Sequence, residues 1–348
     1  MIRVAINGYG RIGRNVHRQF ITRFPEEIDV VAVNASSSAE LRAYLLTYDS
    51  LHGKLSATVR VENEQEFSVN GKRVRVVNER DPAKCPWKKE RIDIVIESTG
   101  NFCTADSAGK HLLAGSKKVL VTAPMKDETP TFIIGVNDDH ITPDLTILSN
   151  ASCTTNCIAP VIAIMDANFG IDHLLVNSVH AFTASQTLLD NKGEDGDFRR
   201  SRAATLSVIP TKTGAVKACT KIFPHLKGKI DGMAFRVPVP TVSCAYMAFT
   251  LKKEVTAEEI NERLTEAAAS DRLKNILSVC TQQCVSIDFQ TDPHSSIVDA
   301  AFTKVVNKGK AAQILSWYDN EWGYAMRVTE TAVRLGHMLQ GIGVRETQ

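Results

Sequence analysis

The sequence lacks an excess of charge of either sign. Its 348 residues include 41 Lys and Arg against 39 Asp and Glu, a formal net charge of +2 at pH 7. That balance gives no sign of bulk attraction to nucleic acid or to acidic membranes. With 43% hydrophobic and 23% charged residues, the composition excludes disorder and collagen-like repetition. The length fits two domains of about 150 residues each.

Membrane-directing segments are also absent. The start, Met1 to Asn7, does not show the basic-then-apolar order of a secretory signal. The most apolar stretch, residues 233–251, is interrupted by Arg236, Pro238 and Pro240 and is therefore no membrane span. We expect a cytoplasmic protein without a membrane partner, in which thiols stay reduced.

The cysteines are not clustered as they are in small secreted scaffolds. The eight are Cys85, Cys103, Cys153, Cys157, Cys219, Cys244, Cys280 and Cys284. In a reducing compartment each is a core residue, a metal ligand or a nucleophile. Two pairs have three-residue gaps, but neither has the two-residue gap or the adjacent histidines of a zinc site, so we expect no metal.

The first half predicts a dinucleotide-binding fold. An apolar run, Ile2 to Ile6, leads into Gly8-x-Gly10-x-x-Gly13, a helical pattern and a second apolar run at residues 30–33. In such a unit the glycines allow a tight turn and close approach of a pyrophosphate, which the helix N-terminus attracts. Strand-like runs follow at residues 92–96, 118–122 and 146–148, with a helix at 105–115. The alternation predicts an α/β domain with a Rossmann-type parallel sheet.

After about residue 152 the pattern changes to longer segments that alternate apolar and polar residues. Strands are predicted at residues 174–182, 232–239, 242–251, 286–289, 296–301 and 312–317. With helices at 256–269 and 329–339, this predicts an α+β catalytic domain whose sheet is mostly antiparallel. We assign residues 1–152 and 320–348 to the dinucleotide-binding domain and 153–319 to the catalytic domain. The polar insert at 190–197 is the most loop-like stretch.

Cys153 is the candidate nucleophile. It follows a run of polar residues and precedes an apolar helix at 158–165. The dipole and free N–H groups of a helix N-terminus stabilise a thiolate, so we expect a lowered pKa. The alternatives are a capped helix start around a buried thiol, or half of a metal site. His180, which ends the apolar strand, is the candidate base, or else a core histidine.

Basic and hydroxyl residues in the second half suggest anion binding. Arg236 sits in an apolar strand, a costly position unless it meets an anion. Residues 211–214, Thr-Lys-Thr-Gly, precede a helix at 215–221 and form a hydroxyl-rich nest. The arginine-rich run at 199–202 is a further candidate for anion binding, or else its members form ion pairs on the surface.

The end of the second strand carries no carboxylate. It reads Val33-Asn34-Ala35-Ser36-Ser37-Ser38, and the first acidic residue is Glu40. An acidic side chain there normally bonds the ribose hydroxyls and repels a 2′-phosphate. Either the ribose contacts come from elsewhere, or the chain tolerates a 2′-phosphate with serine hydroxyls to bond it.

Together these motifs resemble phosphorylating glyceraldehyde-3-phosphate dehydrogenase over almost the whole chain. The matching stretches are residues 6–14, 48–53, 97–100, 149–157 and 317–324. The resemblance implies a homotetramer that oxidises glyceraldehyde 3-phosphate with inorganic phosphate and NAD or NADP to 1,3-bisphosphoglycerate, reversibly and with no nucleic-acid partner. It also implies that the loop around residues 182–206 reaches a neighbour's cofactor site.

The resemblance implies roles for single residues as well. Cys153 is expected to form a thiohemiacetal and then a thioester, with His180 as base and with the Cys153 N–H stabilising the oxyanion. Cofactor contacts are expected from Gly8, Gly10, Arg11, Ile12, Gly13, Asn34, Ala35, Arg80, Thr99, Thr122 and Asn320. Substrate or phosphate contacts are expected from Ser152, Thr154, Thr183, Thr213, Gly214 and Arg236.

The sequence departs from this family in three places. NAD-using members carry Asp where this chain has Ala35, and Leu-Pro where it has Asn191-Lys192 with a longer loop. Both replaced features resemble those that exclude a 2′-phosphate, so we expect usable, even preferred, NADP. Ser185 stands where an aspartate is usual, so the substrate-phosphate contacts at this position differ from the family pattern.

Two alternative functions are kept open. Residues 292–295, Asp-Pro-His-Ser, are similar to the erythrose-4-phosphate dehydrogenase branch, which releases a free acid. The nest at 211–214 favours the phosphorylating enzyme instead. A non-enzymatic protein that binds nucleotide or RNA is disfavoured by the near-zero charge and by the cysteine–histidine pair.

Overall fold

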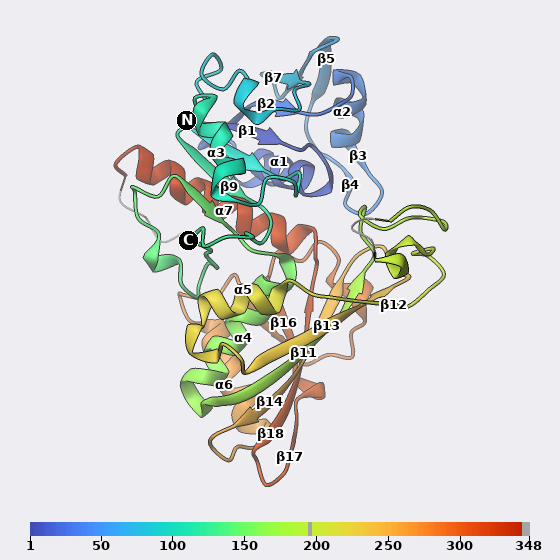
Figure 1. Cartoon of the computed structure of the whole chain (residues 1–348), viewed down its shortest axis with the longest axis vertical. Helices are drawn as coiled ribbons and strands as arrows, with labels where there is room; N and C mark the ends of the chain where they lie inside the picture. The colour runs from blue at the N-terminus through green and yellow to red at the C-terminus, as the bar shows by residue number, and fades with distance from the viewer. Residues whose placement is uncertain (194–196, 343–348) are drawn as a thin grey trace. The chain divides into compact units, whose positions relative to one another are not determined.

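The computed structural model describes residues 1–193 and 197–342, and the chain divides into two units (Figure 1). The first contains Met1–Phe132, Asp139–Ala151 and Ala325–Gln348; the second contains Ile133–Asp138 and Ser152–Tyr324. These bounds differ from the predicted domains at residues 133–138, at Ser152 and at residues 320–324, all of which belong to the second unit. Across the described ranges, no helix is long and apolar enough to cross a membrane.

The first unit is built on an eight-stranded sheet in the order β10-β9-β8-β1-β2-β7-β6-β5. Its strands are β1 (Ile2–Asn7), β2 (Ile28–Asn34), β5 (Val59–Asn63), β6 (Glu66–Val69), β7 (Lys72–Val77), β8 (Ile94–Glu97), β9 (Lys118–Val121) and β10 (Ile147–Ser149). The pairs from β10 to β7 are parallel, which confirms the predicted Rossmann-type sheet. The antiparallel edge β7-β6-β5 was not predicted; β5 is mostly exposed, whereas β6 and β7 carry buried apolar residues that the sequence analysis missed.

Helices connect the strands of the first unit. They are α1 (Arg11–Arg23), α2 (Ala39–Thr47), α3 (Ala105–Leu113) and, from Ala325 onward, α7 (Trp322–Leu339). Short elements complete it: β3 (Tyr48–Asp49), β4 (Gly53–Lys54), η1 (Pro82–Lys84) and the last two residues of η2 (Asp138–His140). A reciprocal hydrogen-bonded cap between Thr104 and Ser107 starts α3, which supplies partners for otherwise orphaned N–H groups.

The second unit is built on a sheet in the order β12-β13-β11-β14-β18-β16-β15, with β17 on β18. Its strands are β11 (Ile171–Ala181), β12 (Ile209–Thr211), β13 (Ile230–Val237), β14 (Ser243–Leu251), β15 (Leu277–Cys280), β16 (Ser296–Asp299), β17 (Lys304–Val306) and β18 (Ala311–Tyr318). β11 pairs with β13 and β15 with β16 in parallel, and the other pairs are antiparallel. The predicted mostly antiparallel sheet is confirmed.

One predicted strand is wrong. Residues 286–289 form the 3-10 helix η5 (Ser286–Phe289). The Asp288 carboxylate accepts the N–H of Val285 at 2.7 Å, which caps a tight turn instead of leaving an extended chain. The other 3-10 helices of this unit are η3 (Phe198–Ser201), η4 (Pro224–Leu226) and η6 (Ala300–Phe302).

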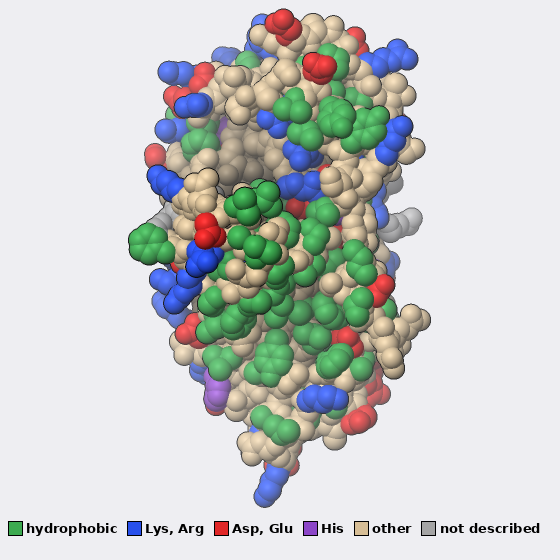
Figure 2. All heavy atoms as spheres, turned by 90° about the vertical axis from the view of Figure 1, so that its right-hand side faces the viewer, with side chains coloured by type: hydrophobic (Ala, Val, Ile, Leu, Met, Phe, Trp, Pro, Cys, Tyr) green, Lys and Arg blue, Asp and Glu red, His purple; other side chains and the backbone are tan. Residues whose placement is uncertain are grey.

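One face of this sheet is covered by helices and the other is open. α4 (Cys153–Phe169), α5 (Ala215–Ile222) and α6 (Ala257–Ala269) pack on it and share one apolar core with its strands. Along β11, residues 174, 176, 178 and 180 are buried, whereas Leu175 and Val179 are exposed. Figure 2 shows a broad apolar area on the open face. The alternation places His180 on the helix-covered face, where α4 begins.

Candidate active site

Cys153 is the first residue of α4. The side chain of Ser152, the N-cap, accepts the N–H of Thr155 at 3.2 Å, which fixes the start of the helix. Two residues before the cysteine, Ala151 has a positive φ of 54°, so the chain turns sharply into the helix. The thiol therefore sits where the helix presents free N–H groups and the positive end of its dipole.

His180 meets this thiol from the sheet. Its Nε2 lies 3.5 Å from Sγ of Cys153, within the reach of a proton transfer. Arg236 stands beside it, because β11 and β13 run parallel with His180 and Arg236 in register. Nη1 of Arg236 lies 2.7 Å from Nδ1 of His180 and 3.1 Å from the carbonyl oxygen of Ala181.

Burial dominates the electrostatics of the pair. It raises the pKa of the Cys153 thiol, although Arg236 and hydrogen bonds from Thr154 act in the opposite direction. Burial, and then the charge of Arg236, lowers the pKa of His180 to about 3. The prediction of a lowered pKa for Cys153 is wrong for this state, because desolvation by burial outweighs the charge of Arg236 and the hydrogen bonds from Thr154. At neutral pH the pair is therefore a thiol facing a neutral imidazole.

Tyr318, which sequence reasoning did not single out, supports this arrangement. Its hydroxyl lies 2.8 Å from Oγ1 of Thr154 and 3.2 Å from Oγ of Ser178. Its ring meets that of His180 edge to face at 6.0 Å. The only signal in the sequence is its place in the 317–324 stretch. The Thr154 hydroxyl thus contacts Tyr318, and Thr154 also bonds the Cys153 thiol through its side chain and its backbone.

Asn320 is held by a serine that the sequence also did not reveal. Oγ of Ser243 accepts the N–H of Ala181 at 3.0 Å and donates to Oδ1 of Asn320 at 2.9 Å. Because Asn320 is bonded through its oxygen, its amide nitrogen is the group available to a ligand. The bridge also ties Asn320 to the residue that follows His180.

Hydroxyl and guanidinium groups gather on the segment after β11. Nη2 of Arg200 donates to Oγ of Ser185 at 2.8 Å, and Ser185 lies 3.0 Å from the hydroxyl of Thr183. Within the described part of the chain, Nε of Arg200 and Nε of Arg236 are buried and have no hydrogen-bond partner. The sequence did not distinguish Arg200 from the other arginines at 199–202, whereas its contact with Ser185 does.

The predicted anion nest starts a helix that packs against α4. The hydroxyl of Thr213 accepts the N–H of Ala215 at 3.2 Å, and Gly214 is the N-cap of α5. Contacts between α5 and α4 place the two helices together in the second unit. The N–H groups of the first turn of α5 make this end favourable for an anion.

The glycine turn of the first unit fits a dinucleotide. Gly8 has a φ of +93°, and an added Cβ would lie 2.7 Å from the backbone nitrogen of Thr99. At Gly13 a Cβ would lie 2.4 Å from the carbonyl oxygen of Gly8, so close packing of helix on strand requires glycine. A Cβ at Gly10, the N-cap of α1, would point into open space, which is where a pyrophosphate needs room.

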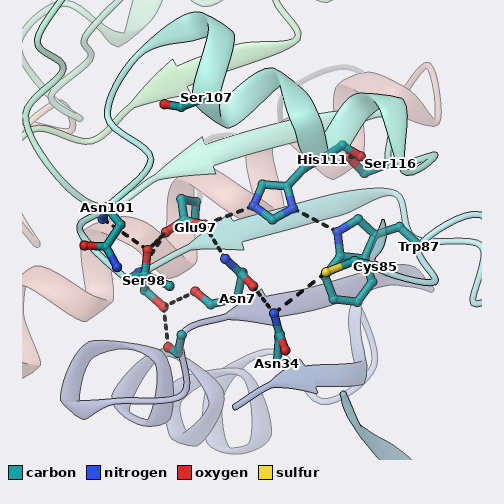
Figure 3. Close-up of polar contacts among 12 residues, drawn as sticks. Asn7, Asn34, Cys85, Trp87, Glu97, Ser98, Asn101, Ser107, His111 and Ser116 are labelled. Atoms are coloured by element: carbon teal, nitrogen blue, oxygen red, sulfur yellow. Dashed lines mark hydrogen bonds and ion pairs between the residues drawn. The ribbon is translucent and has the colours of Figure 1, made fainter. Parts of the chain in front are cut away.

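A buried polar network organises the carboxyl ends of β1, β2 and β8 (Figure 3). Glu97 is 1% exposed and accepts from Nδ2 of Asn7 at 2.5 Å and from the N–H of Thr99 at 2.8 Å. Nε2 of His111 lies 3.0 Å from Glu97, while Nδ1 accepts from the indole of Trp87 at 2.9 Å. Since an indole only donates, His111 must donate to Glu97 and is neutral.

Two predicted cofactor residues, Asn34 and Thr99, have their side chains engaged in this network. Nδ2 of Asn34 donates to Asn7 at 2.6 Å and to the carbonyl of Glu79 at 2.7 Å, and its oxygen accepts the N–H of Glu79 at 3.0 Å. The hydroxyl of Thr99 donates to Glu97 at 2.5 Å. Both side chains are thus committed inside the protein, so they shape the crevice instead of offering free groups to a ribose.

The other predicted cofactor residues differ in what they leave available. The Arg11 guanidinium donates two hydrogen bonds to Asp49, at 2.5 and 3.1 Å, so this side chain is committed inside the protein. The N–H of Ala35 bonds the carbonyl of Val77, so a methyl group is what Ala35 presents. Arg80 is exposed, and the N–H of Thr122 bonds the carbonyl of Glu97.

The comparisons with known proteins agree on one family over almost the whole chain. Residues 2–105 match the family "Glyceraldehyde 3-phosphate dehydrogenase, NAD binding domain" and residues 152–320 match its C-terminal domain. The chain is 47% identical to glyceraldehyde-3-phosphate dehydrogenase 2 of Bacillus subtilis, over 97% of this chain and 98% of that protein. It is 46% identical to the Streptomyces coelicolor dehydrogenase, over 97% and 99%. To the chloroplastic dehydrogenase A of Zea mays it is 45% identical, over 95% and 81%.

Proposed function

The chain belongs to the glyceraldehyde 3-phosphate dehydrogenase family, and from this premise we propose how it works. It oxidises glyceraldehyde 3-phosphate with inorganic phosphate and a nicotinamide dinucleotide to 1,3-bisphosphoglycerate, reversibly. The single observation that carries the assignment of roles is the 3.5 Å contact between Sγ of Cys153 and Nε2 of His180. A thiol and a neutral imidazole at that distance form the unit that nucleophilic catalysis needs.

Cys153 is the nucleophile and His180 the base. His180 takes the thiol proton as the sulfur attacks the aldehyde carbon, which gives a thiohemiacetal on Cys153. The bound dinucleotide supplies a hydride acceptor, and the carbon left on sulfur is a thioester. The N–H of Cys153 at the start of α4 and the ring of His180 face the oxyanion in each step. Asn320, held by Ser243, offers its amide nitrogen to the carboxamide of the nicotinamide.

Phosphate groups are bound by two sets of residues. Thr183 and Arg236 take the phosphate of the substrate, and Arg200 joins them because Ser185 holds it beside Thr183. The attacking phosphate uses Ser152, Thr154, Thr213 and Gly214 at the starts of α4 and α5. The unpartnered Nε atoms of Arg200 and Arg236 support anion binding here, because a buried guanidinium is costly without a partner.

The cofactor lies along Gly8, Gly10, Arg11, Ile12, Gly13, Asn34, Ala35, Arg80, Thr99 and Thr122, and NADP is used as well as NAD. Ala35 supports the use of NADP, because its methyl group neither bonds the ribose hydroxyls nor repels a 2′-phosphate. The exposed Ser36 and Arg80 offer a hydroxyl and a cation to such a phosphate. Lys192, exposed on the polar insert, offers another cation; residues 194–196 of that insert lie outside the described ranges.

We also propose a cytoplasmic homotetramer. The open face of the second sheet supports association, because Leu175, Val179 and Met233 are 53%, 36% and 46% exposed there. An apolar area of this kind marks an interface more often than a free surface. All eight cysteines are free thiols, in keeping with a reducing compartment.

One steady-state assay tests the proposal. Both dinucleotides are offered with glyceraldehyde 3-phosphate and with erythrose 4-phosphate, each with and without inorganic phosphate. We expect phosphate-dependent dinucleotide reduction with the triose only, at comparable kcat/KM for NAD and NADP. Activity that survives omission of phosphate overturns the phosphorylating reaction. A preference for NAD above about a thousandfold, some 4 kcal/mol, overturns the use of NADP.

A further inference from the structure

Two thiols outside the active site lie close together on the second unit. Cys280 is the last residue of β15, and Cys284 comes shortly before η5. Both are partly exposed, whereas Cys85, Cys103, Cys157, Cys219 and Cys244 are buried. Since Cys153 is committed to catalysis, this pair comprises the accessible thiols that the reaction leaves unexplained.

The chain between them turns back on itself within three residues. The N–H of Cys284 donates to the carbonyl oxygen of Gln282 at 2.9 Å, and Sγ of Cys280 lies 3.6 Å from the same oxygen. Because one sulfur and the other residue's backbone meet at a single atom, the two side chains are brought side by side. Burial, and then the Cys280 thiol beside it, raises the pKa of the Cys284 thiol. A disulfide requires Cβ atoms roughly 4 Å apart, so its formation depends on this turn holding the two cysteines together.

The pair rests on an apolar cluster that holds it in place. Cys280 and Cys284 pack with Trp317 against Val242, Phe289 and Ile297. The indole of Trp317 stacks on Phe289 at 5.6 Å and donates to Asp299 at 3.2 Å, which fixes its position. The cluster thus holds both cysteines against the same apolar side chains, while their partial exposure admits a small oxidant.

We propose that Cys280 and Cys284 form a reversible intrachain disulfide on exposure to a hydroperoxide. The thiolate of one attacks the peroxide, the O–O bond breaks, and a sulfenic acid forms as alcohol or water leaves. The thiol of the other attacks the sulfenic sulfur, forming the S–S bond and releasing water. In sum the two thiols lose two hydrogen atoms with their electrons, and the hydroperoxide is reduced. A dithiol reverses the reaction by thiol–disulfide exchange.

The bond locks the turn between β15 and η5. In the reduced protein this turn is held by the hydrogen bond at Gln282 and by the packing of two sulfur atoms. A covalent link across residues 280–284 removes conformations from the unfolded chain, so the oxidised protein should unfold at a higher temperature. Trp317 lies in the same cluster, and its fluorescence should fall because a disulfide quenches a neighbouring indole.

The test uses the full chain with Cys153→Ser, so that the catalytic thiol does not contribute. The protein is treated with hydrogen peroxide, digested with trypsin and analysed by mass spectrometry. Residues 275–304 form one tryptic peptide that contains Cys280 and Cys284 and no other cysteine. We expect this peptide to become lighter by two hydrogen atoms, with two thiols lost together from titration and both restored by dithiothreitol.

Matched variants make the result decisive. Cys280→Ser and Cys284→Ser should each stop at a sulfenic acid trapped by dimedone, and Cys219→Ser, at a buried site, should behave like the parent. The proposal is overturned if the peptide stays reduced, if the intact pair accumulates sulfenic acid, or if the link joins two chains. The outcome does not depend on the proposed function, because the Cys153→Ser protein is not assayed for dehydrogenase activity.

Discussion

Nη1 of Arg236 and the carbonyl oxygen of Ala181 both lie 2.7 Å from Nδ1 of His180. That nitrogen either carries a proton, which it donates to the carbonyl, or a lone pair, which accepts from Arg236; it cannot do both. Only the first state leaves Nε2 free to accept the proton of Cys153. An anion that engages Arg236 should therefore favour the form of His180 that acts as a base.

Arg236→Gln should make the Cys153 thiol less reactive at neutral pH. Burial raises the pKa of this thiol and the charge of Arg236 opposes that rise, so removing the charge raises the pKa further. If the pKa of the thiol rises by one unit, the rate of alkylation at a pH below that pKa falls about tenfold. The rate of iodoacetamide reaction against pH measures the midpoint. Arg202→Gln, at an exposed arginine paired with Asp190, is the control and should leave the profile in place.

Cys153→Ser should lower kcat at least about a thousandfold, since a serine hydroxyl does not supply a thiolate or a thioester. Cys157→Ser is the matched control one helical turn away. Cys157 is fully buried, with its sulfur 4.0 Å from Oγ of Ser296 and 3.9 Å from the carbonyl oxygen of Ser316. It should cost stability and spare kcat. Steady-state rates and the mass of a trapped acyl-enzyme report both outcomes, and an acylated Cys153→Ser protein would contradict the assignment.

Ala35→Asp should turn the cofactor preference toward NAD. The new carboxylate would stand at the end of β2, where it can bond ribose hydroxyls and repel a 2′-phosphate. We expect kcat/KM for NADP to fall at least about tenfold, or 1.4 kcal/mol, with little loss for NAD. Ala35→Asn, which has the same shape without the charge, separates repulsion from steric exclusion. Equal losses with both variants would remove the electrostatic argument.

Apolar periodicity predicted the parts of the fold that it controls. The runs at 2–6, 30–33 and 118–122 became central parallel strands, since buried strands must be apolar on both faces. β5 and α2 escaped prediction because the first is exposed and the second has no apolar stripe. Residues 286–289 were wrongly predicted as a strand. The hydrogen bond from the N–H of Val285 to Asp288 makes them a tight helical turn, and apolar periodicity does not reveal that bond.

The candidate site divides in the same way. Cys153 and His180 could be predicted because one precedes an apolar helix and the other ends an apolar strand. Tyr318, Ser243 and Arg200 could not, because their roles arise from pairing between strands distant in sequence. The pKa of Cys153 was mispredicted because a helix terminus is visible in sequence, whereas the desolvation that opposes it is a property of packing.

Glu97→Gln should loosen the dinucleotide crevice. Glu97 accepts from Asn7, Thr99 and His111, so an amide nitrogen in its place would face donors and leave buried groups unpaired. The cost should be about 1–3 kcal/mol in the free energy of unfolding. Urea denaturation measures it, and NADH fluorescence titration should show weaker binding through the displaced Thr99 and Asn34. Glu40→Gln, at an exposed position on α2, should change neither quantity.

Acid should destabilise the first unit through His17. This histidine is 3% exposed, lies 2.6 Å from the hydroxyl of Tyr9, and has its pKa lowered by burial from 6.5 to about 3. Between those values the unfolded chain binds a proton that the folded chain does not. Its contribution is therefore intact above pH 6.5 and is lost as the pH falls, by up to about 1.4 kcal/mol per pH unit.

His17→Gln should flatten the dependence of unfolding free energy on pH in this window, although the variant is less stable at pH 7. His140→Gln, at an exposed histidine near Asp139, should keep the parental slope. Parallel slopes for His17→Gln and the parent would mean that another group sets the acid sensitivity.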